Sequence, residues 1–182
     1  IDSIGGNKMS FYEIDKKYVL NTYKRTPLDI VKGDGGYLYD SNGEKYLDMY
    51  SGIAVLHLGH NDKGLNDAII TQLNRYAHLS NYFASEPVVE LAKKLVDNSF
   101  ASKVFFANSG TEANEGALKL AVKWGKEINK DKTEVISTLN GFHGRSTGAL
   151  ALTGQPTKQE PFSSILPKVK YINYNSIEDL KA

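Results

Sequence analysis

The chain of 182 residues contains no cysteine, which excludes disulfide bonds, thiolate metal sites and thiol nucleophiles. It also lacks a charge excess, because 22 Lys and Arg nearly balance 21 Asp and Glu. Proteins held on nucleic acid by electrostatics carry a clear basic excess, so we expect no nucleic-acid partner. No apolar run approaches the roughly 18 residues that a bilayer span needs, so we expect no membrane partner.

The N-terminus lacks the pattern of a secretory signal, in which a basic segment precedes an apolar one. The chain begins with Ile1, which is not a start residue, and its first methionine is Met9. We therefore expect residues 1–8 to be the remnant of a tag. The absence of cysteine also suits a reducing compartment.

A small antiparallel meander is predicted over residues 28–50, preceded by a helical or irregular arm over 10–25. Its strands are expected at 29–32, 37–40 and 45–50. A glycine-rich turn at 33–36 and the Asn42-Gly43 pair separate them, and both residues of that pair tolerate the positive φ of a hairpin turn. His60, which follows the meander, is predicted to be structural.

After His60 the apolar residues recur at helical spacing. Helices are predicted over 62–77, 86–98, 111–128 and 146–152 and from Ser176, with short strands over 104–107, 134–139 and 169–172. This alternation is typical of an α/β fold with a mainly parallel sheet. We predict an arm with the meander over 9–60 and the first part of a larger α/β domain over 61–182. A helix begins just before Ala182, so we expect the chain to be part of a longer protein.

The sharpest local signal is the string Phe106-Ala-Asn-Ser-Gly-Thr-Glu-Ala-Asn114, which places a turn between a predicted strand and a predicted helix. Ligands bind at this end of parallel strands. The free amides and dipole of the helix, the hydroxyls of Ser109 and Thr111, and the small Gly110 all suit a phosphate. Ser109 and Glu112 also form a capping-box pattern that needs no ligand, so both interpretations stay open.

A second signal, Asn140-Gly-Phe-His-Gly-Arg-Ser146, again lies between a predicted strand and a predicted helix. Phe142, flanked by Gly141 and His143, offers a flat face to an aromatic ring, and Arg145 suits a carboxylate. Taken singly, each residue has a plainer interpretation: a core Phe, a structural His143 and a surface ion pair. Loops from successive strands meet at one sheet edge, so together they predict a site for a phosphorylated aromatic cofactor and an acid.

Several strings match the class III aminotransferases that use pyridoxal phosphate. They are Ser51-Gly-Ile-Ala-Val55, Leu58-Gly-His60, Ser80-Asn-Tyr-Phe83, Glu86-Pro87, Asn108-Ser-Gly-Thr-Glu-Ala-Asn-Glu115, Phe142-His-Gly-Arg145 and Thr153-Gly-Gln155. From about Asn21 to its end the chain resembles this family, which implies the N-terminal part of a fold type I pyridoxal-phosphate-dependent transferase. The resemblance implies that Gly110 and Thr111 bind the cofactor phosphate, that Phe142 stacks on its pyridine ring, and that Arg145 binds the substrate α-carboxylate. The chain departs from the family after Gly59-His60, where it has Asn61-Asp62 and many members have a second His and a Pro.

The strings at 51–55 and 80–83 favour the members that act on N-acetylornithine. The implied reaction moves its δ-amino group to 2-oxoglutarate and yields N-acetylglutamate 5-semialdehyde and glutamate, a step of arginine biosynthesis in a cytoplasmic homodimer with active sites at the subunit interface. Ornithine, succinylornithine, succinyl-diaminopimelate and 4-aminobutyrate remain alternative substrates. A non-catalytic, split or truncated phosphate-binding module remains an alternative of another class.

Pyridoxal chemistry needs a lysine for the Schiff base and a carboxylate against the pyridine nitrogen. The resemblance implies that both lie beyond Ala182, because no lysine here has the family's context. Lys119, Lys123 and Lys126 belong to a predicted helix, and Lys168 and Lys170 flank a predicted strand. We therefore expect no catalytic residue and no metal site in this chain, and no turnover by it alone.

Overall fold

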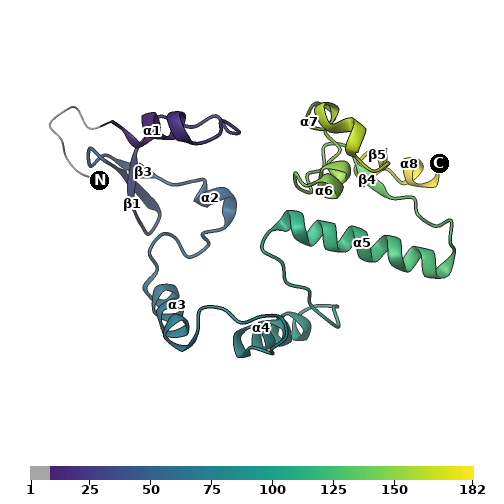
Figure 1. Ribbon diagram of the computed structural model, residues 1–182, viewed down its shortest axis with the longest axis horizontal. Coiled ribbons are helices and arrows are strands. Elements are labelled where there is room, and N and C mark those ends of the chain that lie inside the picture. The colour runs from purple at the N-terminus through teal and green to yellow at the C-terminus, as the bar shows by residue number, and fades with distance from the viewer. Residues whose placement is uncertain (1–8) are drawn as a thin grey trace. The chain divides into compact units, whose positions relative to one another are not determined.

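The structure is a computed structural model that describes residues 9–182, so the expected tag remnant at 1–8 lies outside the described residues. The chain divides into two units, one ending at Phe83 and one running from Ala84 to Ala182 (Figure 1). Each unit is described by itself. Both predicted loops of the site lie in the second unit.

The first unit begins with helix α1 (Phe11–Tyr18), which is the helical part of the predicted arm. A capping box starts it: Ser10 Oγ accepts from Glu13 N at 3.1 Å, and Ser10 N donates to the Glu13 carboxylate at 3.3 Å. The Asp29 carboxylate accepts from the backbone N–H groups of Phe11 and Tyr12 at 2.8 and 2.9 Å. These contacts fasten the helix to the start of the meander.

The predicted antiparallel meander is confirmed as a sheet of order β1-β2-β3. Its strands are β1 (Ile30–Asp34), β2 (Tyr37–Asp40) and β3 (Lys45–Leu47). Two boundaries were predicted wrongly. The first strand continues through residues 33–34, because Gly33 pairs with Leu38. The third ends before Asp48, whose carboxylate accepts from Tyr50 N and Ser51 N and turns the chain.

Two helices complete the first unit. A one-turn segment labelled α2 (Ser51–Ala54) was not predicted, and its φ angles of 47–68° lie in the left-handed region. That region is costly for a β-branched residue such as Ile53, so local propensity argues against this turn. Helix α3 (Lys63–Arg75) lies within the predicted 62–77, and Asp62 caps it by accepting from Leu65 N at 2.8 Å.

His60 binds the meander in two ways, as expected of a structural residue. Its backbone exchanges two hydrogen bonds with Gly35, at 2.7 and 2.9 Å. Its Nε2 donates to Asp48 Oδ2 at 2.7 Å. This hydrogen bond, followed by those from Ser51 N and Tyr50 N, lowers the pKa of the Asp48 carboxyl below its ordinary value.

A pH dependence follows from that lowered pKa. A carboxyl whose pKa is lower in the folded than in the unfolded protein stabilises the fold. The stabilisation is complete above the unfolded-state pKa of about 3.9 and is lost as pH falls through the folded-state pKa. We expect Asp48→Asn, which keeps size but not charge, to lower stability at pH 7, and the gap from wild type to narrow as pH falls below 4. Urea midpoints measured between pH 7 and pH 3 check this, and a pH-independent gap would contradict it.

The second unit opens with α4 (Glu86–Asp97) and α5 (Gly110–Ile128), close to their predicted bounds. The predicted parallel pairing is confirmed: β4 (Ile136–Thr138) pairs with β5 (Lys170–Ile172), with Ser137 opposite Tyr171. Between them lie α6 (Thr147–Leu152), α7 (Pro156–Gln159) and the 3₁₀ helix η1 (Glu160–Ile165), of which only α6 was predicted. Helix α8 (Ile177–Lys181) ends the chain after its cap, Ser176.

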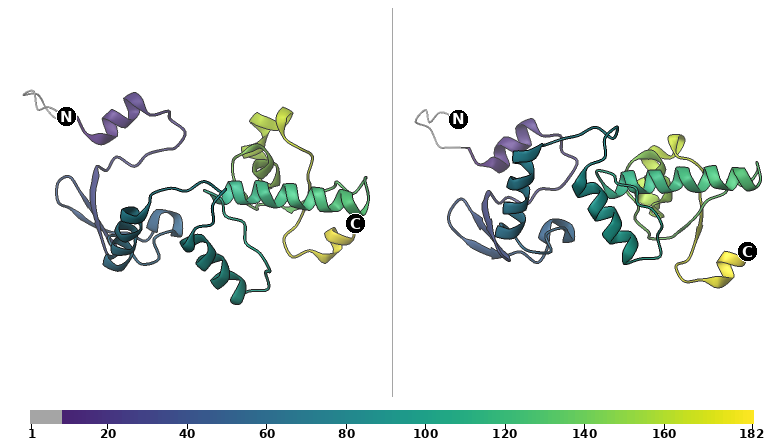
Figure 2. Two further views of the ribbon diagram at one scale, coloured as in Figure 1. Left: turned by 60° about the horizontal axis from the view of Figure 1, so that its bottom comes forward. Right: turned by 90° about the horizontal axis from the view of Figure 1, so that it is seen from below.

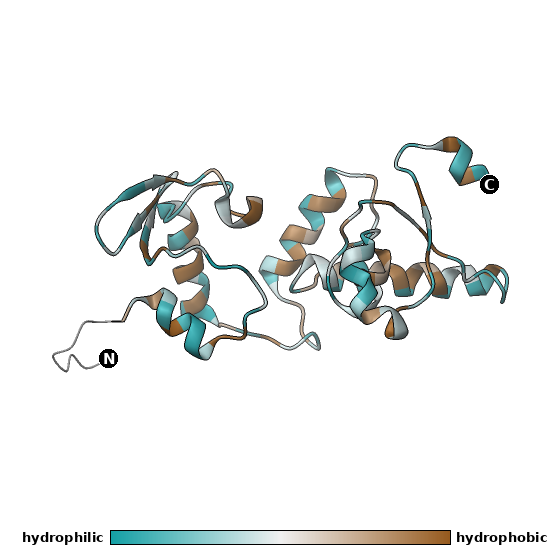
Figure 3. Ribbon diagram, turned by 90° about the horizontal axis from the view of Figure 1, so that it is seen from above, coloured by the Kyte–Doolittle hydropathy of each residue, from teal (hydrophilic) through white to brown (hydrophobic). Residues whose placement is uncertain are grey.

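The core of the second unit is centred on α6, which lies against α5 (Figure 2). Ala149, Leu150 and Ala151 are its buried apolar residues, and Thr153 beside them is fully buried. Much apolar surface elsewhere is exposed, and Figure 3 shows hydrophobic residues along both long helices of this unit. On α5, Leu120 and Trp124 are 64% and 63% exposed.

The predicted buried strand over 104–107 is wrong. The segment has no regular secondary structure, and Phe105 and Phe106 are 65% and 41% exposed. A strand exists only with a hydrogen-bonded neighbour. The parallel sheet within residues 9–182 consists of β4 and β5, and neither pairs with this segment. The apolar composition is that of a strand, but its partner is missing.

Candidate functional site

The first part of the site is the N-terminus of α5. Ser109 is its cap, and the Ser109 Oγ accepts from Glu112 N at 3.3 Å. Among the hydrogen bonds of the described residues, none involves the N–H of Gly110 or of Thr111, as expected for the first two positions of a helix. A Cβ built on Gly110 meets nothing within 4 Å. This helix end offers two free donors and open space, which suits an anion.

The side chain of Ser109 is occupied by Glu112. Its hydroxyl donates to Glu112 Oε2 at 2.9 Å, and Asn108 Nδ2 donates to Glu112 Oε1 at 3.1 Å. The Asn108 bond, followed by the Ser109 bond, lowers the pKa of the Glu112 carboxyl, which is therefore ionised at neutral pH. The helix-cap interpretation of Ser109 is thus realised, and its role toward a phosphate stays a prediction.

The second part of the site is the loop over 140–146, which binds directly to the start of α5. Thr111 Oγ1 accepts from the backbone N–H groups of Arg145 at 3.3 Å and Ser146 at 3.4 Å, and it lies 3.0 Å from Ser146 Oγ. Asn114 Nδ2 donates to the carbonyl of His143 at 2.9 Å. The two loops that the sequence predicts to be neighbours are therefore hydrogen-bonded to each other.

The loop presents an aromatic ring beside two cations. Phe142 is 59% exposed, so it is no core residue. The guanidinium carbon of Arg145 lies 5.9 Å from the centre of its ring, and Lys158 Nζ lies 5.5 Å from it. Both are within cation–π range. No acidic group pairs with Arg145 among the ion pairs of residues 9–182, so the surface ion pair is not realised.

Lys158 is a residue that sequence reasoning missed. Its Nζ donates to Gln155 Oε1, and Gln155 Nε2 donates to the carbonyl of Gly141 at 3.1 Å. The string Thr153-Gly-Gln155, quoted above only as a match, was the signal that this segment reaches back to the loop. The link brings a second positive charge to the Phe142 ring.

Glu115 and Thr153 were missed as well. Glu115 Oε1 accepts from Ser146 Oγ at 2.5 Å, from Gly148 N at 2.8 Å and from Ala149 N at 3.1 Å. Thr153 Oγ1 accepts from His143 N at 2.9 Å and donates to Gly144 O. These two side chains hold the loop and the start of α6 by hydrogen bonds. His143 is half-buried and its Nε2 lies 3.4 Å from Ser137 Oγ, so it belongs to the same support.

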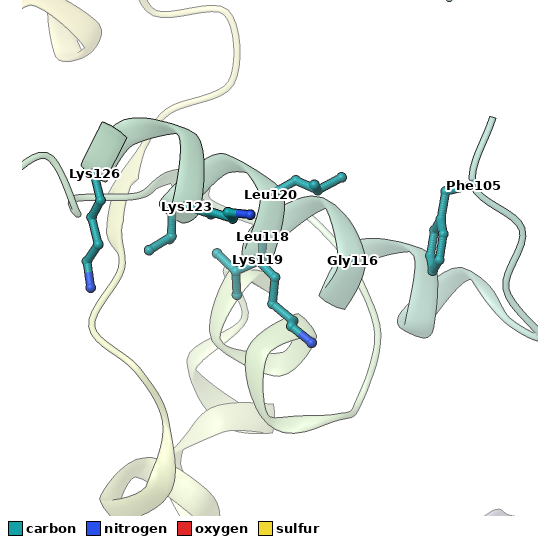
Figure 4. Close-up of a pocket in the computed structure, with 8 residues that line it drawn as sticks. Phe105, Gly116, Leu118, Lys119, Leu120, Lys123 and Lys126 are labelled. Carbon is teal, nitrogen blue, oxygen red and sulfur yellow. The ribbon is translucent and has the colours of Figure 1, made fainter. Parts of the chain in front are cut away.

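One cavity of the second unit lies away from these loops. It has a volume of about 730 Å³ and runs along α5 between Phe105 and Lys126. Figure 4 shows that its lysines, which include Lys119 and Lys123, extend from α5. It contains no predicted site residue. Its apolar lining is the exposed side of α5.

Two features are absent from residues 9–182. No group of three or more His, Asp or Glu side chains is placed to hold a metal ion. None of the helices there combines the length and the apolar character that crossing a membrane requires.

The comparison with protein families identifies the class of protein to which this fold and site belong. The model of the aminotransferase class-III family matches residues 18–182. The chain belongs to this family. Its α/β fold, with a small antiparallel sheet and a parallel sheet, is that of the family's fold type I members.

The curated relatives are more specific. The chain is 46% identical over 91% of its length to the acetylornithine aminotransferase of Caldanaerobacter subterraneus subsp. tengcongensis, of which it covers 42%. It is 40% identical over 91% of its length to a succinylornithine transaminase of Salmonella paratyphi A, of which it covers 41%. The chain thus spans less than half the length of these relatives.

Solved structures of aminotransferases share the fold of this chain. The ornithine aminotransferase of Toxoplasma gondii, which holds pyridoxal phosphate (PLP) at partial occupancy in its active site, superposes with a TM-score of 0.85. It is 28% identical, and the match covers 94% of this chain and 41% of that one. An omega transaminase of Pseudomonas jessenii, solved with PMP, has a TM-score of 0.81 at 33% identity, covering 91% and 39%.

A prediction about Thr111 follows from its hydrogen bonds. Replacing it with Val keeps its shape but removes the acceptor for two N–H groups of the loop, a change that typically costs about 1–3 kcal/mol. In the full-length protein we expect Thr111→Val to weaken binding of a carboxylate substrate by about 5–100-fold and to loosen a phosphorylated cofactor. Steady-state KM and a cofactor titration measure the two effects.

The matched control is Thr111→Ser, which keeps the hydroxyl. It should recover most of both losses. If the Val and Ser variants bind substrate equally well, the Thr111 hydroxyl does not organise the site.

Proposed function

We propose that the full-length protein is a pyridoxal-phosphate-dependent aminotransferase that transfers the δ-amino group of N-acetylornithine to 2-oxoglutarate. The observation that carries the proposal is the junction at Thr111, whose hydroxyl binds the loop of Phe142 and Arg145 to the start of α5. An anion site, an exposed ring and a guanidinium therefore lie on adjacent segments of one unit. Family membership supports assigning this arrangement to a cofactor and an amino-acid substrate.

The residues present fit pyridoxal phosphate. The free N–H groups of Gly110 and Thr111, together with the open space at Gly110, would hold the phosphate, while the exposed face of Phe142 would stack on the pyridine ring. The chemistry supplied by the bound cofactor is an electron sink. Ser109, which caps α5, would add its hydroxyl to the contacts with the phosphate.

Arg145 would hold the α-carboxylate of the amino donor and so orient its amino group toward the cofactor. The Schiff-base lysine and the carboxylate opposite the pyridine nitrogen would come from the part of the longer protein outside these 182 residues. This chain would thus contribute binding and orientation, and the remainder would contribute proton transfer.

The names of the relatives support an acylated ornithine as the donor. We extend the proposal to arginine biosynthesis and to a cytoplasmic homodimer with its active sites at the subunit interface, as the family resemblance implies. Succinylornithine, ornithine and 4-aminobutyrate are the alternative donors. The proposed contacts to the cofactor and to a carboxylate would be the same for all of these donors, so measured rates are needed to identify the substrate.

The test uses the full-length gene product with added pyridoxal phosphate. We expect visible absorbance from the bound cofactor and the highest kcat/KM, with 2-oxoglutarate as acceptor, for N-acetylornithine among succinylornithine, ornithine and 4-aminobutyrate. Faster turnover of another donor would reassign the substrate. A natural product with the mass of 182 residues, unable to transaminate, would replace the proposal with a non-catalytic phosphate-binding module.

A further inference from the structure

We propose that Glu115 is a positioning residue, which sets the substrate-binding Arg145 by holding the residues that follow it. The inference rests on the proposed function, because Arg145 is assigned to the substrate carboxylate there. Glu115 lies on α5, one turn beyond Thr111, and faces the loop rather than the proposed ligands. It acts through its neighbours and needs no contact with substrate or cofactor.

Three donors converge on one oxygen of Glu115. Oε1 accepts from the hydroxyl of Ser146 at 2.5 Å and from the N–H groups of Gly148 and Ala149 at 2.8 and 3.1 Å. Hydrogen bonds to a charged acceptor are stronger than those to a neutral one. Removing the carboxylate would leave its three partly buried donors without an acceptor, which costs free energy. The Ser146 bond, against the opposing effect of burial and with help from Ala149 and Gly148, lowers the pKa of Glu115.

The backbone of the loop is shaped around this carboxylate. A Cβ built on Gly148 would lie 2.4 Å from Glu115 Oε2, so an added methyl group would have to displace the carboxylate from its three donors. Gly148 and Ala149 are both buried, which leaves water little access to their N–H groups. The carboxylate and the glycine are therefore complementary parts of one contact.

Arg145 is consequently fixed on both sides. Its own N–H donates to Thr111 Oγ1, and the next residue, Ser146, binds both Thr111 and Glu115. The guanidinium is exposed, has no acidic partner among the ion pairs of the described residues and lies 5.9 Å from the Phe142 ring centre, so hydrogen bonds hold Arg145 through its backbone. Loss of Glu115 releases the C-terminal side of that backbone.

The experiment compares Glu115→Ala, Glu115→Asp and Glu115→Gln in the full-length holoenzyme, with Glu127→Ala on the exposed side of α5 as control. Two amino donors are used: N-acetylornithine and N-acetyl-1,4-diaminobutane, which is the same molecule without its carboxylate. If the second is not turned over, its Ki as a competitive inhibitor is measured. Cofactor absorbance and melting temperature are recorded for every variant.

We expect Glu115→Ala to raise KM for N-acetylornithine about tenfold with kcat changed less than about threefold, and to leave binding of the carboxylate-free amine within about twofold. Asp, which is one methylene too short, should behave like Ala, whereas Gln keeps the reach and an acceptor oxygen and should recover most of the loss. In an Arg145→Ala background, Glu115→Ala should add little, because the two residues act as a unit.

Equal weakening of both amines, or equal effects in the wild-type and Arg145→Ala backgrounds, would overturn the positioning role and leave a structural one. If Glu115→Ala does not fold, the comparison of Glu115→Asp with wild type decides: a selective rise in KM for the carboxylate substrate supports the role, and a uniform loss or an unchanged KM overturns it. A wild-type protein that transaminates neither donor would instead overturn the proposed function.

Discussion

Arg145→Ala is expected to raise KM for N-acetylornithine by about 10²–10³-fold while leaving cofactor absorbance unchanged. Truncating one partner of a hydrogen-bonded charge pair costs about 2–5 kcal/mol, which is a factor of about 30 to 5,000, and the expected rise lies in the middle of that range. The Arg145 guanidinium is exposed, so its removal leaves no buried group unpaired within the fold itself. Steady-state kinetics with the full-length enzyme, beside a melting curve, separate loss of binding from loss of structure.

Arg145→Lys is the informative control. Lysine keeps the charge but not the planar fork that matches a carboxylate, so we expect a KM between those of the wild type and the alanine variant. Lys158 supplies a second cation near the Phe142 ring, and we expect Lys158→Ala to raise KM less than Arg145→Ala does. If Arg145→Ala instead releases cofactor and leaves KM unchanged, Arg145 serves the cofactor and the assignment of roles is wrong.

Much of the fold could be predicted because its signals are local. Ser109 and Glu112 mark the start of α5, and the Asn42-Gly43 pair marks the hairpin. Alternating helices and apolar strands predict a mainly parallel sheet, in which β4 pairs with β5. The first two features depend on residues within a few positions of one another, and the third on the order of helices and strands along the chain. The closeness of the 109–111 and 140–146 segments was also predicted, but the expected reason, two neighbouring strands of one sheet, is not realised within residues 9–182, where Thr111 joins the two segments by hydrogen bonds.

The remainder depends on groups that are distant in sequence. The segment over 104–107 has a strand's composition but no partner strand within residues 9–182, so composition alone misled. Glu115 looks like an ordinary helical acid until the fold brings Gly148 to it, and Lys158 looks like an ordinary exposed lysine until Gln155 turns back to Gly141. The left-handed turn at Ser51–Ala54 opposes local preference, which no propensity argument anticipates.

Gly144 is the position at which a single methyl group should do most damage to the fold of the site. Its φ of +133° is a backbone conformation that residues with a side chain rarely adopt. A Cβ placed there would lie 2.0 Å from Thr111 Oγ1, far inside contact distance. Gly144 is also buried, and its carbonyl accepts from Thr153 Oγ1 at 3.2 Å, so the backbone has little room to move.

We therefore expect Gly144→Ala to destabilise the full-length protein by about 2–5 kcal/mol, from backbone strain and overpacking together. Gly110→Ala is the matched control, since its Cβ meets nothing within 4 Å and its φ is not positive, and it should change stability by less than about 1 kcal/mol. Urea unfolding followed by circular dichroism compares the two. The clash falls on the hydroxyl that joins α5 to the Arg145 loop, so any folded Gly144→Ala protein should also show a raised KM for the carboxylate substrate. Equal midpoints for the two variants would mean that the loop and the helix are not packed as closely as Thr111 and Gly144 indicate.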